Sequence, residues 1–225
     1  MFAPNIENES DTTLKKLAHL FECGEPSRRR GSIKGMKTEI RRLTPAEYLL
    51  ATPQLVDLYI EAMDYPANVR TARIASWRQE ALSPGFTAIA AIADDTLVGV
   101  AYGMLGQRER WWDHQLRQAL AMQGGPSKSE QAMLENYFEV AEIHVLPNYQ
   151  GRGIGATLLR ELMHLAPAKW ALLSTPEVAN EDNGAFKLYR KFGFVDVARN
   201  YLYPADPRPF AILGRPLPLE TPSMR

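Results

Sequence analysis

The chain has 225 residues, enough for one compact domain with a sizeable core, or for one domain and a tail. Hydrophobic residues make up 45% of it and charged residues 23%, which is ordinary for a globular protein and argues against wholesale disorder. The 26 basic and 26 acidic side chains cancel, so no overall field attracts nucleic acid or an anionic membrane, and we expect neither as a partner.

Cysteine and histidine are too few and too scattered for a disulfide framework or a metal site. Cys23 is the single cysteine, which excludes an intramolecular disulfide and favours a reducing, cytoplasmic setting. The four histidines are spread along the chain, whereas a structural zinc site needs several Cys and His together, so no metal is predicted. Neither a secretory leader nor an apolar run of about 18 residues is visible, and we expect no membrane span.

The pattern of composition divides the chain into three parts. Residues 1–36 are polar and predict a flexible N-terminal extension, in which the basic stretch SRRRGSIK is best interpreted as a solvated linker. Residues 37–214 are predicted to form the folded domain. Residues 215–225, which are rich in proline, are predicted to be a tail.

The first half of the domain carries signals for a strand, two helices and a hairpin. Residues 38–43 predict a strand, and the Thr-Pro pair at 44–45 is typical of the start of a helix. A Tyr-Pro pair at 65–66 interrupts the helical pattern, which then resumes. Two aspartates at 94–95 separate apolar runs, which indicates a hairpin.

Residues 103–136 have the character of an insertion. One helix is predicted in RERWWDHQLRQALAMQ, closed by Gly-Gly-Pro. Trp111 and Trp112 fit either a lid that contacts substrate or an amphipathic helix packed on the core, and both interpretations stay open. Near the C-terminus, FAILG is expected to form the last strand.

Three alternating glycines lie between a predicted strand and a predicted helix. Residues 137–147 are rich in β-branched and aromatic side chains and predict a strand that ends at Pro147. Gly151, Gly153 and Gly155 follow, and apolar residues then recur at helical spacing. A helix N-terminus leaves backbone N–H groups unpaired and carries partial positive charge, so this junction suits a phosphate or pyrophosphate.

Two common nucleotide-binding loops do not fit this stretch. A P-loop ends in Gly-Lys-Ser/Thr, whereas Gly155 is followed by Ala156 and Thr157. A dinucleotide fingerprint has the spacing G-x-G-x-x-G, which the alternation at 151, 153 and 155 lacks. A turn without a ligand needs one glycine and hardly explains three.

The stretch QGRGIG, residues 150–155, and the strand AEIHVLPNY before it resemble the Q/R-x-x-G-x-G/A signature of the GNAT superfamily of acetyl-CoA-dependent N-acetyltransferases. WALLSTPEVANEDNGAFKLYRKFGFVDV, residues 170–197, resembles the strand, helix and strand that follow in that family. The resemblance covers about residues 37–214. It implies an α/β (α+β) fold with a mixed, mostly antiparallel sheet of about six to seven strands, flanked by helices. It also implies that the strand before the loop splays from the next one, with the pantetheine arm of acetyl-CoA between them.

The resemblance also implies which residues bind the cofactor. The main chain of three strand residues would pair with pantetheine, namely Ile143, His144 and Val145. The amides of the loop and the first helical turn would hold the pyrophosphate, namely those of Gln150, Gly151, Arg152, Gly153, Ile154, Gly155, Ala156 and Thr157. Tyr189 and Asn183 would complete the site, although the family's usual Asn falls on Asp182. Arg152 and a basic group on the later helix would lie where the phosphates emerge, namely Lys187, Arg190 and Lys191, although a solvated helix face explains the latter three equally well.

Acetyl transfer to an amine needs a base for the ammonium, because amines are mostly protonated at neutral pH. Glu142 is the favoured base and His144 the second choice, against the simpler interpretation of a salt-bridged or packed strand residue. Strand alternation puts Glu142 on one face with Val140, and Glu139 on the other. Only one glutamate is therefore expected to face the acceptor unless a bulge intervenes.

The departing thiolate needs an acid, and Tyr189 is predicted in that role. Its family position lies beside the cofactor sulfur, and a phenol can protonate a thiolate, although an aromatic core residue is the simpler alternative. It shares a helix face with Ala185, Leu188 and Phe192 and is expected to point inward. The N–H of Val145 is the expected donor to the developing oxyanion.

The sequence therefore predicts an enzyme, an N-acetyltransferase that moves an acetyl group from acetyl-CoA to a primary amine by direct attack on the thioester. The alternative is a regulatory module that binds acyl-CoA without turnover. The acceptor is an amine-bearing small molecule or protein, near which Asp64, Tyr65 and Trp112 are expected. The sequence shows no acidic cluster typical of a site for polycations. Pairing of the last strands across subunits would give a homodimer.

Overall fold

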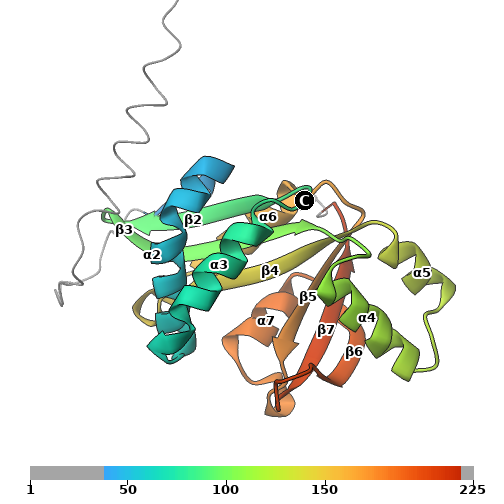
Figure 1. Cartoon of the computed structure of the whole chain (residues 1–225). Helices are drawn as coiled ribbons and strands as arrows, with labels where there is room; N and C mark the ends of the chain where they lie inside the picture. The colour runs from blue at the N-terminus through green and yellow to red at the C-terminus, as the bar shows by residue number, and fades with distance from the viewer. Residues whose placement is uncertain (1–37, 219–225) are drawn as a thin grey trace, which may run out of the picture.

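A seven-stranded sheet in the order β1-β2-β3-β4-β5-β7-β6 forms the centre of the computed structural model, which describes residues 38–218 (Figure 1). The predicted extension, residues 1–36, lies outside the described residues, and so do residues 219–225 of the predicted tail. Neighbouring described strands are antiparallel except β4 and β5, which are parallel. This mixed sheet confirms the predicted fold class. The strands are β1 (Thr38–Leu43), β2 (Thr87–Ala93), β3 (Thr96–Leu105), β4 (Tyr137–Val145), β5 (Trp170–Pro176), β6 (Val195–Leu202) and β7 (Pro209–Pro216).

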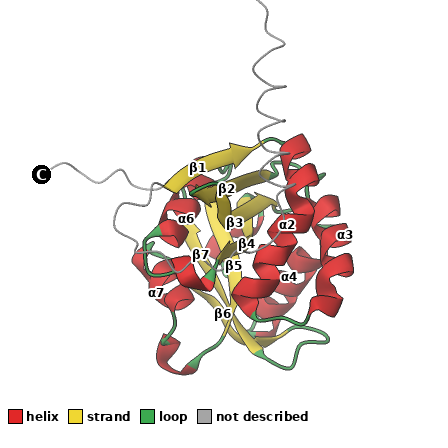
Figure 2. Ribbon diagram, turned by 90° about the vertical axis from the view of Figure 1, so that its left-hand side faces the viewer, coloured by secondary structure: helices red, strands yellow, loops and turns green. Residues whose placement is uncertain are grey.

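Helices cover both faces of the sheet, with α6 and α7 on one side and α2, α3 and α4 on the other (Figure 2). Apolar cores fill both interfaces, around Leu158 and Phe186 on the first side and around Leu55 and Trp77 on the second. No helix within residues 38–218 has the length and apolar character needed to cross a membrane. The helices are α2 (Pro45–Met63), α3 (Arg70–Glu80), α4 (Trp111–Met122), α5 (Lys128–Leu134), α6 (Ile154–His164) and α7 (Gly184–Lys191), with short 3₁₀ turns η1 (Ala67–Val69), η2 (Pro147–Tyr149) and η3 (Ala179–Glu181).

The first half of the domain follows its local signals. Thr44 caps α2 in a capping box, because its hydroxyl accepts from the N–H of Glu47 while the carboxylate of Glu47 accepts from the N–H of Thr44. The helix stops at Asp64, which is left-handed with φ 53°. Asp94 and Asp95 both have positive φ, at 47° and 59°, which suits a two-residue hairpin turn. The predicted helix start, interruption and hairpin are confirmed.

The insertion holds one helix more than predicted. The expected helix is α4, but α5 follows it, and Ser127 caps the start of α5 in a capping box with Glu130. The pattern Ser-x-x-Glu at 127–130 was the sequence signal that could have found it. Together α4 and α5 pack against β5, β6 and β7 through a third apolar cluster. Strand β3 continues to Leu105, so the inserted segment starts later than residue 103.

Strands β4 and β5 pair at only three positions, the last of which joins Glu139 to Leu172. Beyond it, β4 runs on to Val145 and β5 to Pro176 without pairing with each other, although β4 still pairs with β3 and β5 with β7. The sheet is therefore open between them, which confirms the predicted splay.

A bulge in β4 changes which side chains share a face. The register with β3 shifts at Gly103, and Ala141 is the extra residue. A Cβ at Gly103 would lie 2.3 Å from the carbonyl oxygen of Glu139, so only glycine fits beside the bulge. Val140 consequently packs in the α6–α7 core, while Glu139 and Glu142 both line one cleft. The predicted pairing of Glu142 with Val140 on one face is wrong, because the bulge interrupts the alternation.

Candidate active site

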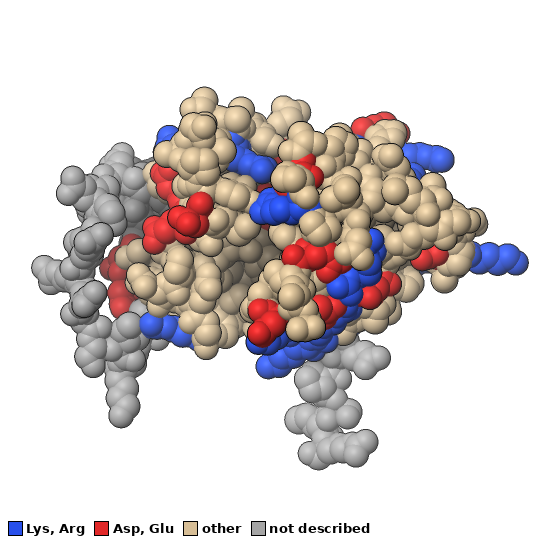
Figure 3. All heavy atoms as spheres, turned by 90° about the horizontal axis from the view of Figure 1, so that it is seen from below, with Lys and Arg blue, Asp and Glu red and all other residues tan. Residues whose placement is uncertain are grey.

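A cleft of about 750 Å³ opens where β4 and β5 separate. Its walls come from the C-terminal end of α2, one side of α3, the start of α4, the middle of β4, the end of β5, residues of α7 and the loop between β6 and β7. Figure 3 shows the hollow on one face of the molecule, with acidic and basic side chains around it. The predicted base candidates on β4 and Tyr189 on α7 all line this cleft.

The two candidate bases form a pair. Nε2 of His144 lies 2.6 Å from a carboxylate oxygen of Glu142, and the histidine is 9% exposed. Its ring stacks on Trp77 with centroids 6.5 Å apart and meets the edge of Tyr59 at 4.9 Å. The carboxylate on one ring nitrogen and the two neighbouring aromatic rings together fix the orientation of the imidazole.

Three carboxyl groups converge in the cleft, which the sequence did not reveal. Glu139 is 6% exposed, and burial raises its pKa to about 7 although Arg110 lies 3.5 Å away. Glu80, on α3, accepts a hydrogen bond of 2.5 Å from the Tyr102 hydroxyl, and burial raises its pKa as well. Glu142 is the third. Even so, no three acidic, histidine or cysteine side chains among the described residues are close enough to hold a metal ion.

The helix α7 brings Tyr189 and Asn183 to the cleft. Tyr189 is 6% exposed and points inward as expected, and burial, with Glu142 nearby, raises the pKa of its phenol. Asn183 caps α7, because its side-chain oxygen accepts from the N–H of Phe186 at 2.8 Å. Of the two candidate positions for the family's Asn, Asn183 lines the cleft, whereas Asp182 is exposed and pairs with Lys187 at 2.6 Å.

The glycine loop leads into α6 without a side-chain cap. Gly153 is the N-cap residue, and the N–H of Thr157 donates to its carbonyl at 3.0 Å. The amides of Ile154, Gly155 and Ala156 therefore have no acceptor within the helix. Two amides of the predicted cradle are already used, since Thr157 bonds to Gly153 and the N–H of Gln150 donates to the Pro147 carbonyl at 3.3 Å.

The backbone needs glycine at two of the three glycine positions of the loop, but not at the third. Gly151 and Gly153 have φ of 73° and 83°, which side chains rarely adopt. Gly155 is ordinary helix, and a Cβ there would make normal contacts, 3.6 Å to Leu188 and 3.8 Å to Val145. The fold therefore does not require glycine at 155.

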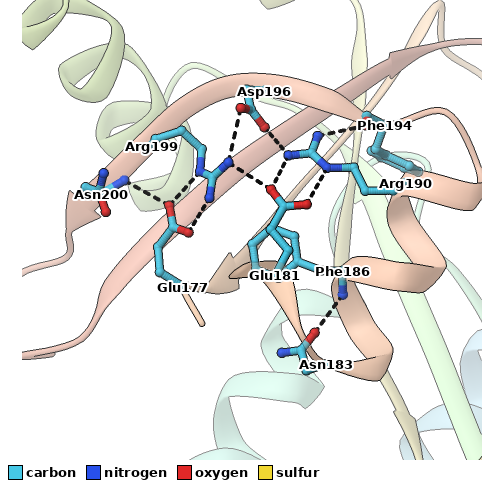
Figure 4. Close-up of polar contacts among 9 residues, drawn as sticks. All are labelled: Glu177, Glu181, Asn183, Phe186, Arg190, Phe194, Asp196, Arg199 and Asn200. Carbon is cyan, nitrogen blue, oxygen red and sulfur yellow. Dashed lines mark hydrogen bonds and ion pairs between the residues drawn. The ribbon is translucent and has the colours of Figure 1, made fainter. Parts of the chain in front are cut away.

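An ion-pair network holds the segment that leads into α7 (Figure 4). Arg190 of α7 pairs with Glu181 at 2.5 Å and also with Asp196 of β6. Arg199 of β6 binds Glu177 with two hydrogen bonds of 2.6 and 2.7 Å, which lower the pKa of that carboxyl. The network joins the connection after β5 to α7 and β6, and so fixes the helix that carries Tyr189. It also occupies Arg190, which the sequence had offered to the phosphates.

Of the other residues predicted to bind the cofactor, two stabilise the glycine loop and one lines the cleft. The side chain of Gln150 donates to the Val145 carbonyl at 2.9 Å and ties the loop to β4. The guanidinium of Arg152 donates to the Asn148 carbonyl at 2.8 Å, beside the loop. Ile143 lines the cleft on β4.

Trp111 and Trp112 were each expected either to contact substrate or to pack on the core, and the structure places the two residues differently. Trp112 is 8% exposed and packs with Tyr137, as in an amphipathic helix, but it also reaches the cleft. Trp111 is 57% exposed and lines the cleft. Tyr65 also lines the cleft, whereas Asp64 ends α2 and does not.

Comparison with known proteins agrees with this geometry. The model of the acetyltransferase (GNAT) family matches residues 52–194. A GCN5-like protein acetyltransferase of Mycobacterium tuberculosis is 37% identical over 199 residues, which are 79% of this chain and 97% of that protein. The N-alpha-acetyltransferase RimI of the same organism is 46% identical over 66 residues, 28% of this chain and 40% of that protein.

A solved structure shows the same fold at low sequence identity. Salmonella typhimurium yncA, solved with its cofactor acetyl-CoA, has a TM-score of 0.52 and 15% identity, with 81% of this chain and 95% of that chain covered. Because the family model spans more than half of the residues and the mycobacterial relative matches over nearly its whole length, the chain belongs to the acetyltransferase (GNAT) family.

Proposed function

We propose that the protein transfers an acetyl group from acetyl-CoA to a primary amine. The observation that carries this proposal is that Tyr189 and the Glu142–His144 pair line one cleft, at the splay between β4 and β5. An acid and a base are thereby held on separate elements around a single space, as acyl transfer to an ammonium requires. A module that only bound acyl-CoA would need neither.

The residues at the start of α6 fit the cofactor. The uncapped first turn offers three backbone N–H groups and the positive end of the helix dipole to an anion, and Gly155 leaves room beside them. The neighbour from Salmonella typhimurium, solved with acetyl-CoA, supports the same choice of donor. When bound, acetyl-CoA supplies the acetyl group as an activated thioester.

The chain's own residues would move two protons. Glu142, with His144 bonded to it, accepts the proton of the ammonium. Tyr189 gives its proton to the departing sulfur, and the second proton, which the nitrogen loses once the C–N bond has formed, restores the phenol directly or through solvent. The raised pKa of Tyr189 keeps its phenol protonated until the sulfur departs. Burial also destabilises the thiolate that leaves beside it, so the thiolate is a strong enough base to take the proton of the phenol. The N–H of Val145 is the proposed donor to the thioester oxygen.

The acceptor is proposed to be a primary amine on a protein or a small molecule. The mycobacterial relative is a protein acetyltransferase, which supports a protein amine. The carboxylate of Glu142 lies in the cleft, where it can receive an amine that arrives protonated.

The test follows free thiol while the purified protein is mixed with acetyl-CoA and a panel of amines. Tyr189→Phe should lower kcat about 100-fold or more while the affinity for acetyl-CoA is kept, and Glu142→Gln should lower kcat most at neutral pH and below, where amines are protonated. Tyr201→Phe is the matched control, since Tyr201 is buried but does not line the cleft. Tight acetyl-CoA binding without thiol release on any amine would support the binding module instead.

A further inference from the structure

One guanidinium in the cleft lies near carboxyl groups, Glu142 and Glu80, but forms no ion pair with either of them. Arg110 lies 3.5 Å from Glu139, and Arg208 pairs with Asp206 at 2.7 Å. Arg73 of α3 lines the same cleft, yet within residues 38–218 it makes neither a hydrogen bond nor an ion pair. Its five N–H donors are therefore available to a ligand.

The position of Arg73 relative to the proposed base is set by one aromatic ring. Its guanidinium carbon lies over Tyr59, 5.2 Å from the ring centroid. The ring of His144 meets the same Tyr59 at 4.9 Å, and His144 holds Glu142. Because both distances are measured to the ring centre of Tyr59, the Arg73 guanidinium carbon lies within about 10 Å of the centre of the His144 ring.

We propose that the acceptor is an amine that carries a carboxylate, with its amine at the Glu142–His144 pair and its carboxylate on Arg73. This inference rests on the proposed acetyl transfer and names the substrate class for that site. A planar guanidinium can donate two parallel hydrogen bonds to one carboxylate. The negative charge of such a ligand also offsets the desolvation cost of holding the guanidinium in a partly enclosed cleft. The carboxylate belongs either to a free amino acid or to an acidic residue beside a lysine in a peptide.

Three amino acids of increasing length test this arrangement and measure the spacing. Binding of glycine, β-alanine and 4-aminobutyrate, and of their carboxamides, is measured by calorimetry on the full chain loaded with CoA. We expect at least one acid to bind at least tenfold more tightly than its amide. The preference should fall below twofold in Arg73→Gln and be partly kept in Arg73→Lys, which retains the charge. Arg78→Gln on the same helix is the matched control, because Arg78 is exposed and does not line the cleft.

A peptide pair distinguishes the two sources of the carboxylate. If the free acids show no preference but a Lys-Asp peptide binds at least tenfold more tightly than Lys-Asn, and only with Arg73 present, the carboxylate comes from a protein. Equal affinities for acid and amide in every pair, or a preference that survives in Arg73→Gln, would overturn the inference. Thiol release is followed in parallel. Its absence with every amine overturns the proposed function, whereas release without any preference for acids overturns only the substrate class.

Discussion

Replacing Glu139 by Gln should make the stability of the protein less dependent on pH. The carboxyl is 6% exposed, and burial raises its pKa from 4.5 to about 7. The folded state therefore binds the proton more tightly than the unfolded state, so the wild type loses stability as the pH rises from 4.5 to 7. A shift of about 2.5 units corresponds to about 3 kcal/mol of unfolding free energy. The glutamine variant stays neutral and does not suffer this loss.

Urea unfolding of both proteins between pH 4.5 and pH 8 measures the effect. The unfolding free energy of the variant minus that of the wild type should increase by about 3 kcal/mol across this range. At the low-pH end the wild-type carboxyl is protonated, so a difference there reflects only the exchange of a carboxylic acid for an amide, and only the change with pH is interpreted. Glu61→Gln, at an exposed position of α2, should give a difference that is the same at both ends. A flat difference for Glu139→Gln as well would refute the raised pKa and the buried carboxyl it depends on.

Two further predictions concern the cofactor seat and the inserted helix. Gly155→Val should raise the Kd for acetyl-CoA at least tenfold, about 1.4 kcal/mol. Gly155→Ala should bind acetyl-CoA nearly as tightly as the wild type, because a single Cβ makes only ordinary contacts there. Equal affinities of the two variants for acetyl-CoA would contradict the proposed seat. Tyr137→Phe removes the hydrogen bond of 2.9 Å to the fully buried Asp113 and should lower the unfolding free energy by about 1–3 kcal/mol in urea titrations. An unchanged denaturation midpoint would show that Asp113 does not need this partner.

The elements that the sequence predicted correctly are those whose signals lie within a few residues. The cap at Thr44 and the turn at residues 94–95 can be predicted from local sequence, because the groups that start the helix or reverse the chain are neighbours in sequence. The helix α5, which was not predicted, also has a local signal, the capping box of Ser127 and Glu130. The bulge at Ala141 is different, since it depends on a glycine in another strand that admits the displaced backbone.

The candidate site divides in the same way. Glu142, His144 and Tyr189 were identifiable because they lie in or next to a motif, although their roles stay predictions. Glu80 and Arg73 belong to α3, which carries no motif, and only the packing of that helix across β3 and β4 brings their charges to the cleft. Charges that come from separate elements cannot be paired from spacing along the chain.

The inserted helix is coupled to the chemistry of the cleft by one ion pair. Asp113 is 1% exposed and its carboxylate accepts a hydrogen bond from the hydroxyl of Tyr137, while Trp112 packs on the ring of the same tyrosine. These contacts fix the first turn of α4 against β4, and Arg110, the residue just before it, is thereby held beside Glu139. Burial raises the pKa of Glu139 and Arg110 opposes that rise. The insertion therefore opposes, through Arg110, the effect of burial on a carboxyl group in the same cleft as the proposed base, and a change that moves Arg110 away should raise the pKa of Glu139 further.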